Sequence, residues 1–275
     1  MSKNHFRRAA SGLALAALML CSPARADWQK IQQSGSLKVA VYNEFAPFSD
    51  KGTGIDIDLA QALSAKLGLK LSLLPFPAGE SLGDDLRNMV WKGHYMGYGP
   101  ADVMLHVPVD KQLLAENDKV QIFAPYYVET VRLVRSARAI PAFNGLDSLA
   151  GKQIGAEKVS IAAMLILGEE DGKFRDNVRI FPTAAAALEK LKGGSLDAVL
   201  ANRSEIESVL KSDPAFPLEE VAFARLPQAG WVVGMAVRKD ELELARLLQA
   251  AMNEMRASGE LKAIFAKYGV QAGTP

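Results

Sequence analysis

The feature that most constrains the fold of this 275-residue chain is an alternation of strand and helix patterns that occurs twice. In residues 37–41 apolar side chains alternate at the two-residue period of a strand. Between Ile55 and Leu67 they recur at helical spacing, and Gly68 ends the pattern. The same order returns in the second half, where residues 196–201 form the nearly continuous apolar run of a buried parallel strand. The sequence therefore predicts an α/β fold with mainly parallel sheets.

Two strand-rich segments, near residues 124–136 and 226–237, join the two halves. After the second one, the chain ends in two helical patterns that have no strands of their own, so we expect these helices to return to the first half. This arrangement predicts two lobes, two hinge crossovers, and an interlobe cleft in which a small ligand is enclosed. The expected limits are 27–130 for the first part of lobe one, 131–228 for lobe two, and 229–275 for the return to lobe one.

The first 26 residues have the pattern of a secretory signal peptide. A basic start precedes an apolar run, Ala9–Leu20, and a small-x-small cleavage site, Ala24–Ala26. The apolar run is shorter than the roughly 20 residues that a membrane span needs. We therefore expect cleavage after Ala26 and a periplasmic location. Cys21, the only cysteine, lies in this segment, so no thiol or disulfide chemistry is expected after cleavage.

Composition argues against several classes of function. Four of the 32 basic side chains and none of the 31 acidic ones lie in residues 1–26, so the rest of the chain carries a net charge of −3. Such a balance does not favour nucleic-acid or anionic-membrane binding. The sequence has no phosphate-binding glycine loop, nucleophile elbow or metal-binding motif. We expect a monomer that uses no metal and no cofactor and has no catalytic residues.

Three aromatic residues follow the first strand: Tyr42, Phe45 and Phe48. Open α/β sheets bind their ligands at the carboxyl ends of the strands, so these rings either stack on a planar or apolar ligand or only pack the turn. His106, at the end of a later strand, is expected to act as a neutral hydrogen-bonding residue of the cleft or as a structural one. Trp231 opens the second crossover and either lines the cleft or braces the hinge.

Segments along nearly the whole chain resemble the family 3 extracellular solute-binding proteins, the amino-acid-type periplasmic receptors of ABC importers. The resemblance implies a type II periplasmic binding fold, a ligand cleft and an ABC permease as partner. The matching segments, in order, are LKVAVYNEFAPFSDKGTGIDIDLAQALSAKLG, ADVMLHVP, APYYVETVRLVRS, LDSLAGKQIGA, FPTAAAALEKLKGGSLDAVLANRSEI and VGMAVRKDELELARLLQAAMNEMRASGELKAIFAKYG.

The ligand-binding residues of that family are only partly present. The arginine that clamps the ligand carboxylate is missing from the segment after the strand that contains His106, and Asn202 stands where the family has an aspartate for the ligand ammonium. The lobe-two turn of the family corresponds to Lys158 and Ser160 here, and Lys158 would pair with an anion. We therefore expect an aromatic or anionic ligand that is not a free amino acid.

Two alternatives to uptake are open. The segment GHYMGYGPADVMLHVPVD, whose glycine-rich part, Gly93–Pro100, is expected to be a loop, is similar to the binding-protein-like components that accompany quinoprotein (PQQ-dependent) alcohol and methanol dehydrogenases. This resemblance implies an accessory or interaction protein whose partner is a periplasmic quinoprotein dehydrogenase. Because dehydratases also use this fold, an enzyme similar to cyclohexadienyl dehydratase is the less favoured alternative.

Overall fold

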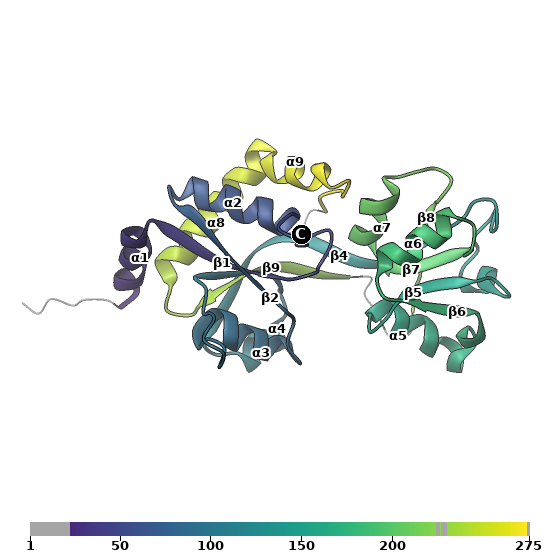
Figure 1. Cartoon of the computed structure of the whole chain (residues 1–275), viewed down its shortest axis with the longest axis horizontal. Helices are drawn as coiled ribbons and strands as arrows, with labels where there is room; N and C mark the ends of the chain where they lie inside the picture. Colours follow the sequence, from purple (N-terminus) through teal and green to yellow (C-terminus); the bar gives the residue numbers. More distant parts are fainter. Residues whose placement is uncertain (1–22, 224–225, 227–229, 274–275) are drawn as a thin grey trace, which may run out of the picture.

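The computed structural model describes residues 23–223, 226 and 230–273, which form two lobes connected by long strands (Figure 1). The predicted leader falls largely outside the described residues, and helix α1 (Pro23–Ser34) runs across the expected cleavage position. None of the helices in the described part of the chain has the length and hydropathy that crossing a membrane requires.

Lobe one holds strands of both halves of the chain. Its sheet has the order β2-β1-β3-β9, in which β1 pairs in parallel with β2 and β3, and β9 pairs antiparallel with β3. The last two helices return to this lobe, as the sequence predicts, because α8 packs on α1 and α2, and α9 packs on α2. Its elements, besides α1, are β1 (Ser36–Tyr42), α2 (Ile55–Lys66), β2 (Lys70–Phe76), α3 (Leu82–Leu86), η1 (Arg87–Trp91), β3 (Val103–Pro108), α4 (Lys111–Glu116), β9 (Gly230–Arg238), α8 (Leu242–Ser258) and α9 (Glu260–Lys267).

Lobe two repeats the parallel pattern around strand β5, which pairs with β6 and β7. Helix α5 packs against one face of this sheet, and α6 and α7 pack against the other (Figure 1). The elements of lobe two are η2 (Leu146–Leu149), β5 (Ile154–Glu157), α5 (Ile161–Gly168), η3 (Glu169–Gly172), η4 (Arg175–Asn177), β6 (Val178–Phe181), α6 (Ala184–Lys192), β7 (Ala198–Asn202), α7 (Arg203–Leu210) and β8 (Leu218–Glu219).

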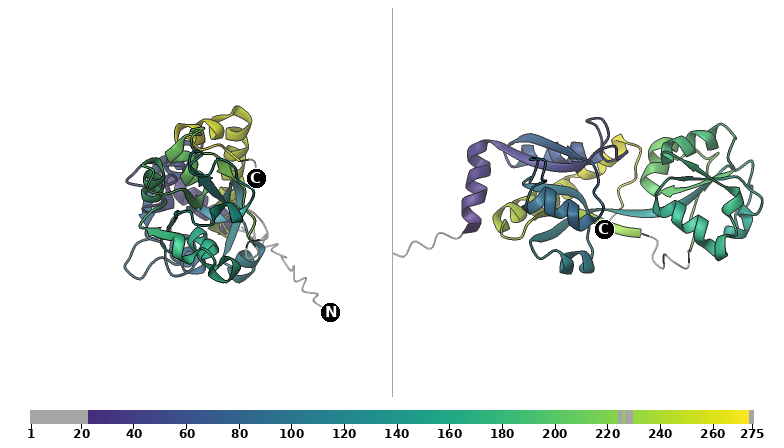
Figure 2. Two further views of the ribbon diagram at one scale, coloured as in Figure 1. Left: turned by 90° about the vertical axis from the view of Figure 1, so that its right-hand side faces the viewer. Right: turned by 60° about the horizontal axis from the view of Figure 1, so that its bottom comes forward.

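Strand β4 (Val120–Arg135) carries the chain from one lobe to the other (Figure 2). It pairs antiparallel with β9 as far as Thr130 and antiparallel with β7 from Val131 onward. The segment is thus one strand, although it contains Pro125. The pairing with β9 shifts register between Phe123 and Tyr127, and this bulge accommodates the proline without ending the strand. The prediction of mainly parallel sheets needs correction, since every pairing of β4 and β9 is antiparallel.

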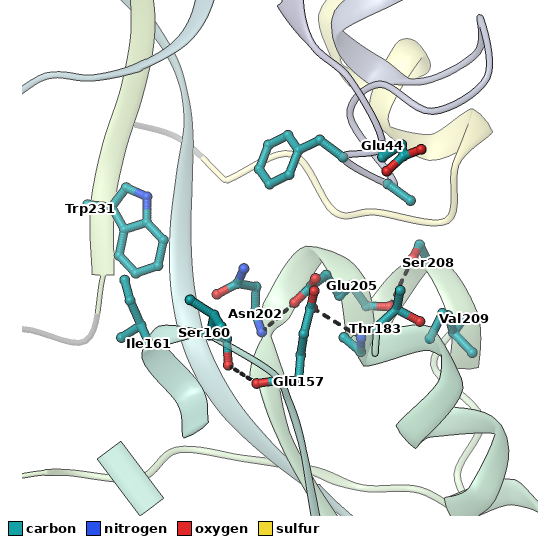
Figure 3. A pocket seen from close by; sticks show the side chains of 15 residues that line it. Glu44, Glu157, Ser160, Ile161, Thr183, Asn202, Glu205, Ser208, Val209 and Trp231 are labelled. Atoms are coloured by element: carbon teal, nitrogen blue, oxygen red, sulfur yellow. Dashed lines mark hydrogen bonds between the residues drawn. The ribbon is translucent and has the colours of Figure 1, made fainter. Parts of the chain in front are cut away.

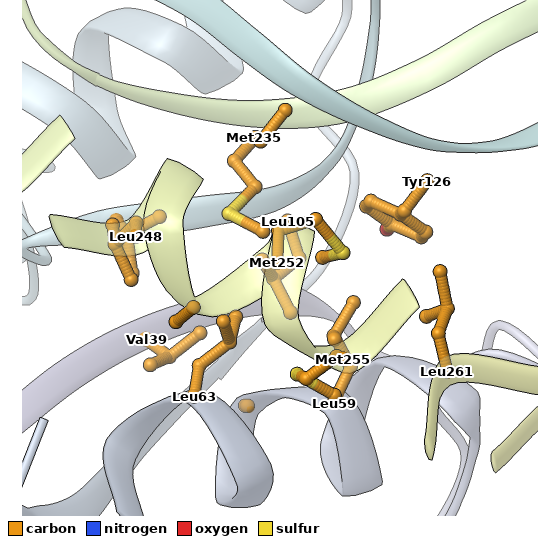
Figure 4. Close-up of a cluster of buried hydrophobic side chains, with 14 of the residues drawn as sticks. Val39, Leu59, Leu63, Leu105, Tyr126, Met235, Leu248, Met252, Met255 and Leu261 are labelled. Atoms are coloured by element: carbon orange, nitrogen blue, oxygen red, sulfur yellow. The ribbon is translucent and has the colours of Figure 1, made fainter. Parts of the chain in front are cut away.

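The hydrophobic core of lobe one lies between its sheet and helices α2, α8 and α9 (Figure 4). Leu59 and Leu63 of α2 face Leu248 and Met252 of α8 there, and all four side chains are fully buried. Apolar residues at helical spacing, which identify α2 in the sequence, are thus the residues that hold it on the sheet. Helix α8 has Glu241 as its N-cap, and the preceding Asp240 pairs with Arg238.

Candidate functional site

The candidate site is a cleft between the two lobes. Two adjoining cavities, of about 570 and 290 Å³, share six residues and so form one continuous space. The shared residues come from the turn after β1, the ends of β5 and β7, and the start of β9: Glu44, Phe45, Glu157, Val159, Asn202 and Trp231. The parallel strands β1, β5 and β7 thus all point their carboxyl ends at the cleft, which is where open α/β sheets bind ligands.

The lobe-one wall of the cleft is aromatic. Phe45 lies at the surface of the cleft, with its ring centroid 5.8 Å from that of Tyr42 and 4.7 Å from that of His106. Hydrogen bonds between the backbones of Phe45 and Ser49 close the turn that holds this ring. Phe48 follows the second of the two alternatives and packs the turn, because its side chain is only 1% exposed and stacks beneath Phe45 at 5.5 Å. It supports the wall and does not line either cavity.

A buried polar group lies behind the aromatic wall. Asp56 Oδ1 accepts a hydrogen bond of 2.7 Å from the hydroxyl of Tyr126, and that hydroxyl accepts one of 2.9 Å from the backbone N–H of His106. His106 Nδ1 lies 3.2 Å from Asp56 Oδ2. Burial and the Asp56 carboxylate both raise the pKa of Tyr126, which therefore stays a hydroxyl and a donor. These contacts fix the imidazole of His106, whose ring lines the larger cavity although it is only 7% exposed.

The lobe-two wall is acidic. Glu157 ends β5, and its Oε2 accepts a hydrogen bond of 3.1 Å from the backbone N–H of Ala184, the first residue of α6. Glu205, in the first turn of α7, accepts one of 3.0 Å from the backbone N–H of Asn202. Figure 3 shows the two carboxylates side by side, with Glu44 of lobe one across the cavity from them. Burial and the neighbouring Glu157 raise the pKa of Glu205 to about 8, since both disfavour its charged form.

Further carboxylates line the larger cavity. Asp85 accepts hydrogen bonds from the hydroxyl of Tyr42 and from the backbone of Gly79, at 3.0 and 2.8 Å. Glu129, on β4, accepts hydrogen bonds from the hydroxyl and the backbone of Ser204. Burial raises the pKa of both carboxyl groups. The acidic residues lining the cleft are Glu44, Glu80, Asp85, Glu129, Glu157 and Glu205, and within the described part of the chain no lysine or arginine lines it.

Three residues of the cleft have backbone angles that disfavour their side chains. Glu44, His106 and Val159 have φ values of 54°, 59° and 57°, although none of them is glycine. Val159 is a β-branched residue, for which this conformation is an outlier, and its side chain is 93% exposed in the cleft. Strained residues of this kind concentrate at ligand clamps, which supports a functional role for the cleft.

Of the residues predicted as ligand contacts in lobe two and at the hinge, some line the cleft and one does not. Lys158 is exposed and lines neither cavity, so the argument for an anionic ligand loses its basis. Ser160 lines the smaller cavity, but its hydroxyl caps α5 by accepting a hydrogen bond from Ala163. Asn202 lines both cavities, at the start of α7. Trp231 lines both cavities and also packs against the hydrophobic cores of both lobes. Its position is therefore compatible with lining the cleft and with bracing the hinge.

Sequence reasoning did not predict Glu157 and Glu205 as residues of the cleft. Of the two, only Glu205 lies in a recognisable sequence pattern. Glu205 follows Asn202 by three positions, which is the spacing of a capping box at the start of a helix. Glu157 is the last residue of a four-residue strand, directly before Lys158, which is the residue that the sequence predicts as a ligand contact. The direction in which each side chain leaves the end of that strand depends on the left-handed backbone at Val159, which the sequence does not indicate.

The raised pKa of Glu205 makes stability depend on pH. Because the native state holds this proton up to a higher pH than the unfolded chain, the free energy of unfolding should fall as the pH rises from about 4.5 to about 8. Glu205→Gln keeps an acceptor for Asn202 and removes the titration, so its stability should fall less over this range. Urea denaturation at several pH values measures the difference, with Glu189→Gln, an exposed residue paired with Lys192, as control. Equal slopes for all three proteins would contradict a raised pKa.

The comparisons with known proteins agree with this architecture, although no family model matches the chain. The chain is 25% identical to a probable histidine-binding protein of Neisseria gonorrhoeae, over 86% of its length and 84% of the relative. It is 22% identical to an L-cystine-binding protein of Escherichia coli, over 87% and 84%. Among solved structures, an ancestral cationic amino acid solute binding protein superposes with a TM-score of 0.69 at 19% identity, covering 88% of this chain and 99% of that one.

These relatives are named as binding proteins and none as an enzyme, which agrees with the prediction of a non-enzymatic protein. The predicted two-lobed fold is confirmed by the structural neighbour and by the two lobes and connecting strands described above. The chain thus has the two-lobed fold of solute-binding proteins, and it is similar in sequence to binding proteins named for histidine and for L-cystine.

Proposed function

We propose that this chain is the ligand-capturing component of an ABC-type uptake system and that its cleft encloses a small cation. The observation that carries the proposal is the charge of the cleft, which is lined by carboxylates from both lobes and, within the described residues, by no lysine or arginine. A cation is attracted by such a wall, whereas an anion is repelled. The relatives include proteins named for histidine and for cationic amino acids, which agrees with a ligand of this charge.

The aromatic wall suits the same ligand. The rings of Tyr42, Phe45 and Trp231 line the cleft together with the carboxylates. A cation over the face of an aromatic ring gains about 0.5–2 kcal/mol, most when it is removed from water. The two lobes would close around the ligand by bending where β4 and β9 pair between them, because closure brings Glu44 of lobe one toward Glu157 and Glu205 of lobe two.

Binding measurements with charge-neutral variants test this function. Small organic cations and anions are screened by thermal shift, since a ligand at a hundredfold excess over its Kd adds about 2.7 kcal/mol of stability. For a cation that binds, the double variant Glu157→Gln/Glu205→Gln should weaken affinity about tenfold or more, because a hydrogen bond to a charged group contributes about 1.5–3 kcal/mol. Glu189→Gln, on the exposed side of α6, serves as control and should bind as the unaltered protein does. Preferred binding of an anion would contradict the proposal.

A second candidate is the accessory role beside a periplasmic quinoprotein dehydrogenase. The observation in its favour is the Gly93–Pro100 loop, where Tyr95 and Met96 are 91% and 70% exposed. Stacking of His94 on Tyr98, at 4.3 Å, and the backbone hydrogen bond between them hold the loop in this shape. None of the relatives reported above is named for a dehydrogenase, so this role stays a prediction. Purification of the tagged protein from its own periplasm tests it, because a quinoprotein that is retained by the protein and lost with Tyr95→Ser/Met96→Ser would support it.

A further inference from the structure

We propose that the cation taken by this cleft is an organic amine without a carboxylate, with a positive charge at each end. The inference rests on the proposed function and narrows it, because a free amino acid carries a carboxylate beside its ammonium group. Three features of the cleft support the proposal: no lysine or arginine of the described residues lines it, side chains already accept from some of the helix N–H groups that border it, and acidic residues face each other across it.

The described residues offer no cation to a ligand carboxylate. Lys158 is exposed outside both cavities. The guanidinium of Arg203, at the start of α7, contacts Glu207 at 2.6 Å and Gln271 at 3.1 Å, and Arg203 does not line the cleft. A ligand carboxylate would therefore be taken out of water without a charged partner and placed among other carboxylates. Such a burial costs several kcal/mol.

The helix N-termini of lobe two do not replace the missing cation. Helices α5, α6 and α7 all begin at the smaller cavity, and free backbone N–H groups there would favour an anion. Side chains of the chain itself already accept hydrogen bonds from some of these groups, at the starts of α5 and α6. The acceptors are Ser160 for Ala163, Thr183 for Ala186, and Glu157 for Ala184. The carboxyl groups of Glu157 and Glu205 thus lie at these helix ends, as a ligand anion would, and offer oxygen acceptors to a ligand amine.

The distribution of acidic residues suggests a ligand with two charges. Glu44 belongs to lobe one, whereas Glu157 and Glu205 belong to lobe two and lie across the cavity from it (Figure 3). One amine of the ligand would reach the acidic residue of lobe one, and the other amine would reach those of lobe two. The methylene chain between the amines would lie against the rings of Phe45 and Trp231. The larger cavity, of about 570 Å³, has the size usual for a small-molecule site.

Matched ligand pairs test the inference, because each pair differs only in the carboxylate. Arginine is compared with agmatine, lysine with 1,5-diaminopentane, and ornithine with 1,4-diaminobutane, by calorimetry and thermal shift. We expect the amine of at least one pair to bind ten times more tightly than its amino acid. We expect Glu44→Gln to weaken a diamine more than it weakens pentylamine, which has one charge. Magnesium chloride at equal concentration is a control for a response to any cation.

The outcomes separate the inference from the proposed function. If the amino acids bind as tightly as their amines and the double variant Glu157→Gln/Glu205→Gln weakens both, the cation-binding function stands and the inference fails. If none of the amines and amino acids binds, or only anions do, both fail. Arg225 lies outside the described residues, so Arg225→Gln is included, and a loss of arginine binding in this variant would reveal a partner for the carboxylate and overturn the inference.

Discussion

Replacing Gly230 with alanine should destabilise the protein by about 3 kcal/mol, the upper end of the cost of overpacking. Gly230 starts β9 and pairs with Thr130 at the point where β4 leaves lobe one. A Cβ atom at this position would lie 2.0 Å from the carbonyl oxygen of Glu129 and 2.6 Å from Cγ2 of Thr130. Both distances are far below van der Waals contact, and a backbone carbonyl cannot rotate away as a side chain can. The two strands would have to separate at the hinge.

Denaturant unfolding measures this effect, and Gly83→Ala provides the matched control. Gly83 lies in helix α3, where the nearest atom to an added Cβ would be Asn117 Oδ1 at 3.5 Å, an ordinary contact. Alanine is the better helix former by up to about 1 kcal/mol, so this variant should be unchanged or slightly more stable. If Gly230→Ala were as stable as Gly83→Ala, the close approach of β4 and β9 at the hinge would be wrong.

The fold followed from the sequence because its signals are local and repeated. The buried side chains of α2, among them Leu59 and Leu63, recur at helical spacing in the sequence and pack on the sheet as that spacing predicts. Thr183 caps α6, and Gly259 ends α8 in a left-handed conformation, and both residue types are favoured at these positions. The prediction failed where long-range pairing decides the outcome. Strand β4 continues through Pro125 because β9 supports it on both sides of a bulge, and no local pattern contains that information.

The candidate site was only partly predictable, for a related reason. Tyr42, Phe45, Asn202 and Trp231 line the cleft because the carboxyl ends of strands meet there, and that rule depends on topology alone. The sequence alone showed that this chain lacks the arginine and the aspartate with which the family it resembles binds its ligands. The sequence does not reveal that Glu157 and Glu205, which come together only in the folded protein, place a pair of acidic side chains beside Asn202.

Removing the carboxylate of Asp56 should destabilise lobe one by about 1–3 kcal/mol. Asp56 is fully buried, and Asp56→Ala would leave the hydroxyl of Tyr126 without its acceptor and would remove the carboxylate that lies 3.2 Å from His106 Nδ1. Each buried group that loses its partner costs about 1–3 kcal/mol. Because the same contacts hold His106 against Phe45 and Phe48, the variant should also bind its ligand more weakly, although Asp56 itself does not line the cleft.

A double-mutant cycle with Tyr126→Phe shows whether these residues act as one unit. Tyr126→Phe keeps the ring and removes only the hydroxyl that links Asp56 to the backbone of His106, so it remains informative even where Asp56→Ala fails to fold. If the two residues support each other, the double variant Asp56→Ala/Tyr126→Phe should be more stable than the sum of the single effects predicts, by about 0.5–3 kcal/mol. Strictly additive effects would show that Asp56 and Tyr126 stabilise the lobe independently. The aromatic wall would then owe its position to ring packing, and ligand affinity should be equal in Tyr126→Phe and the unaltered protein.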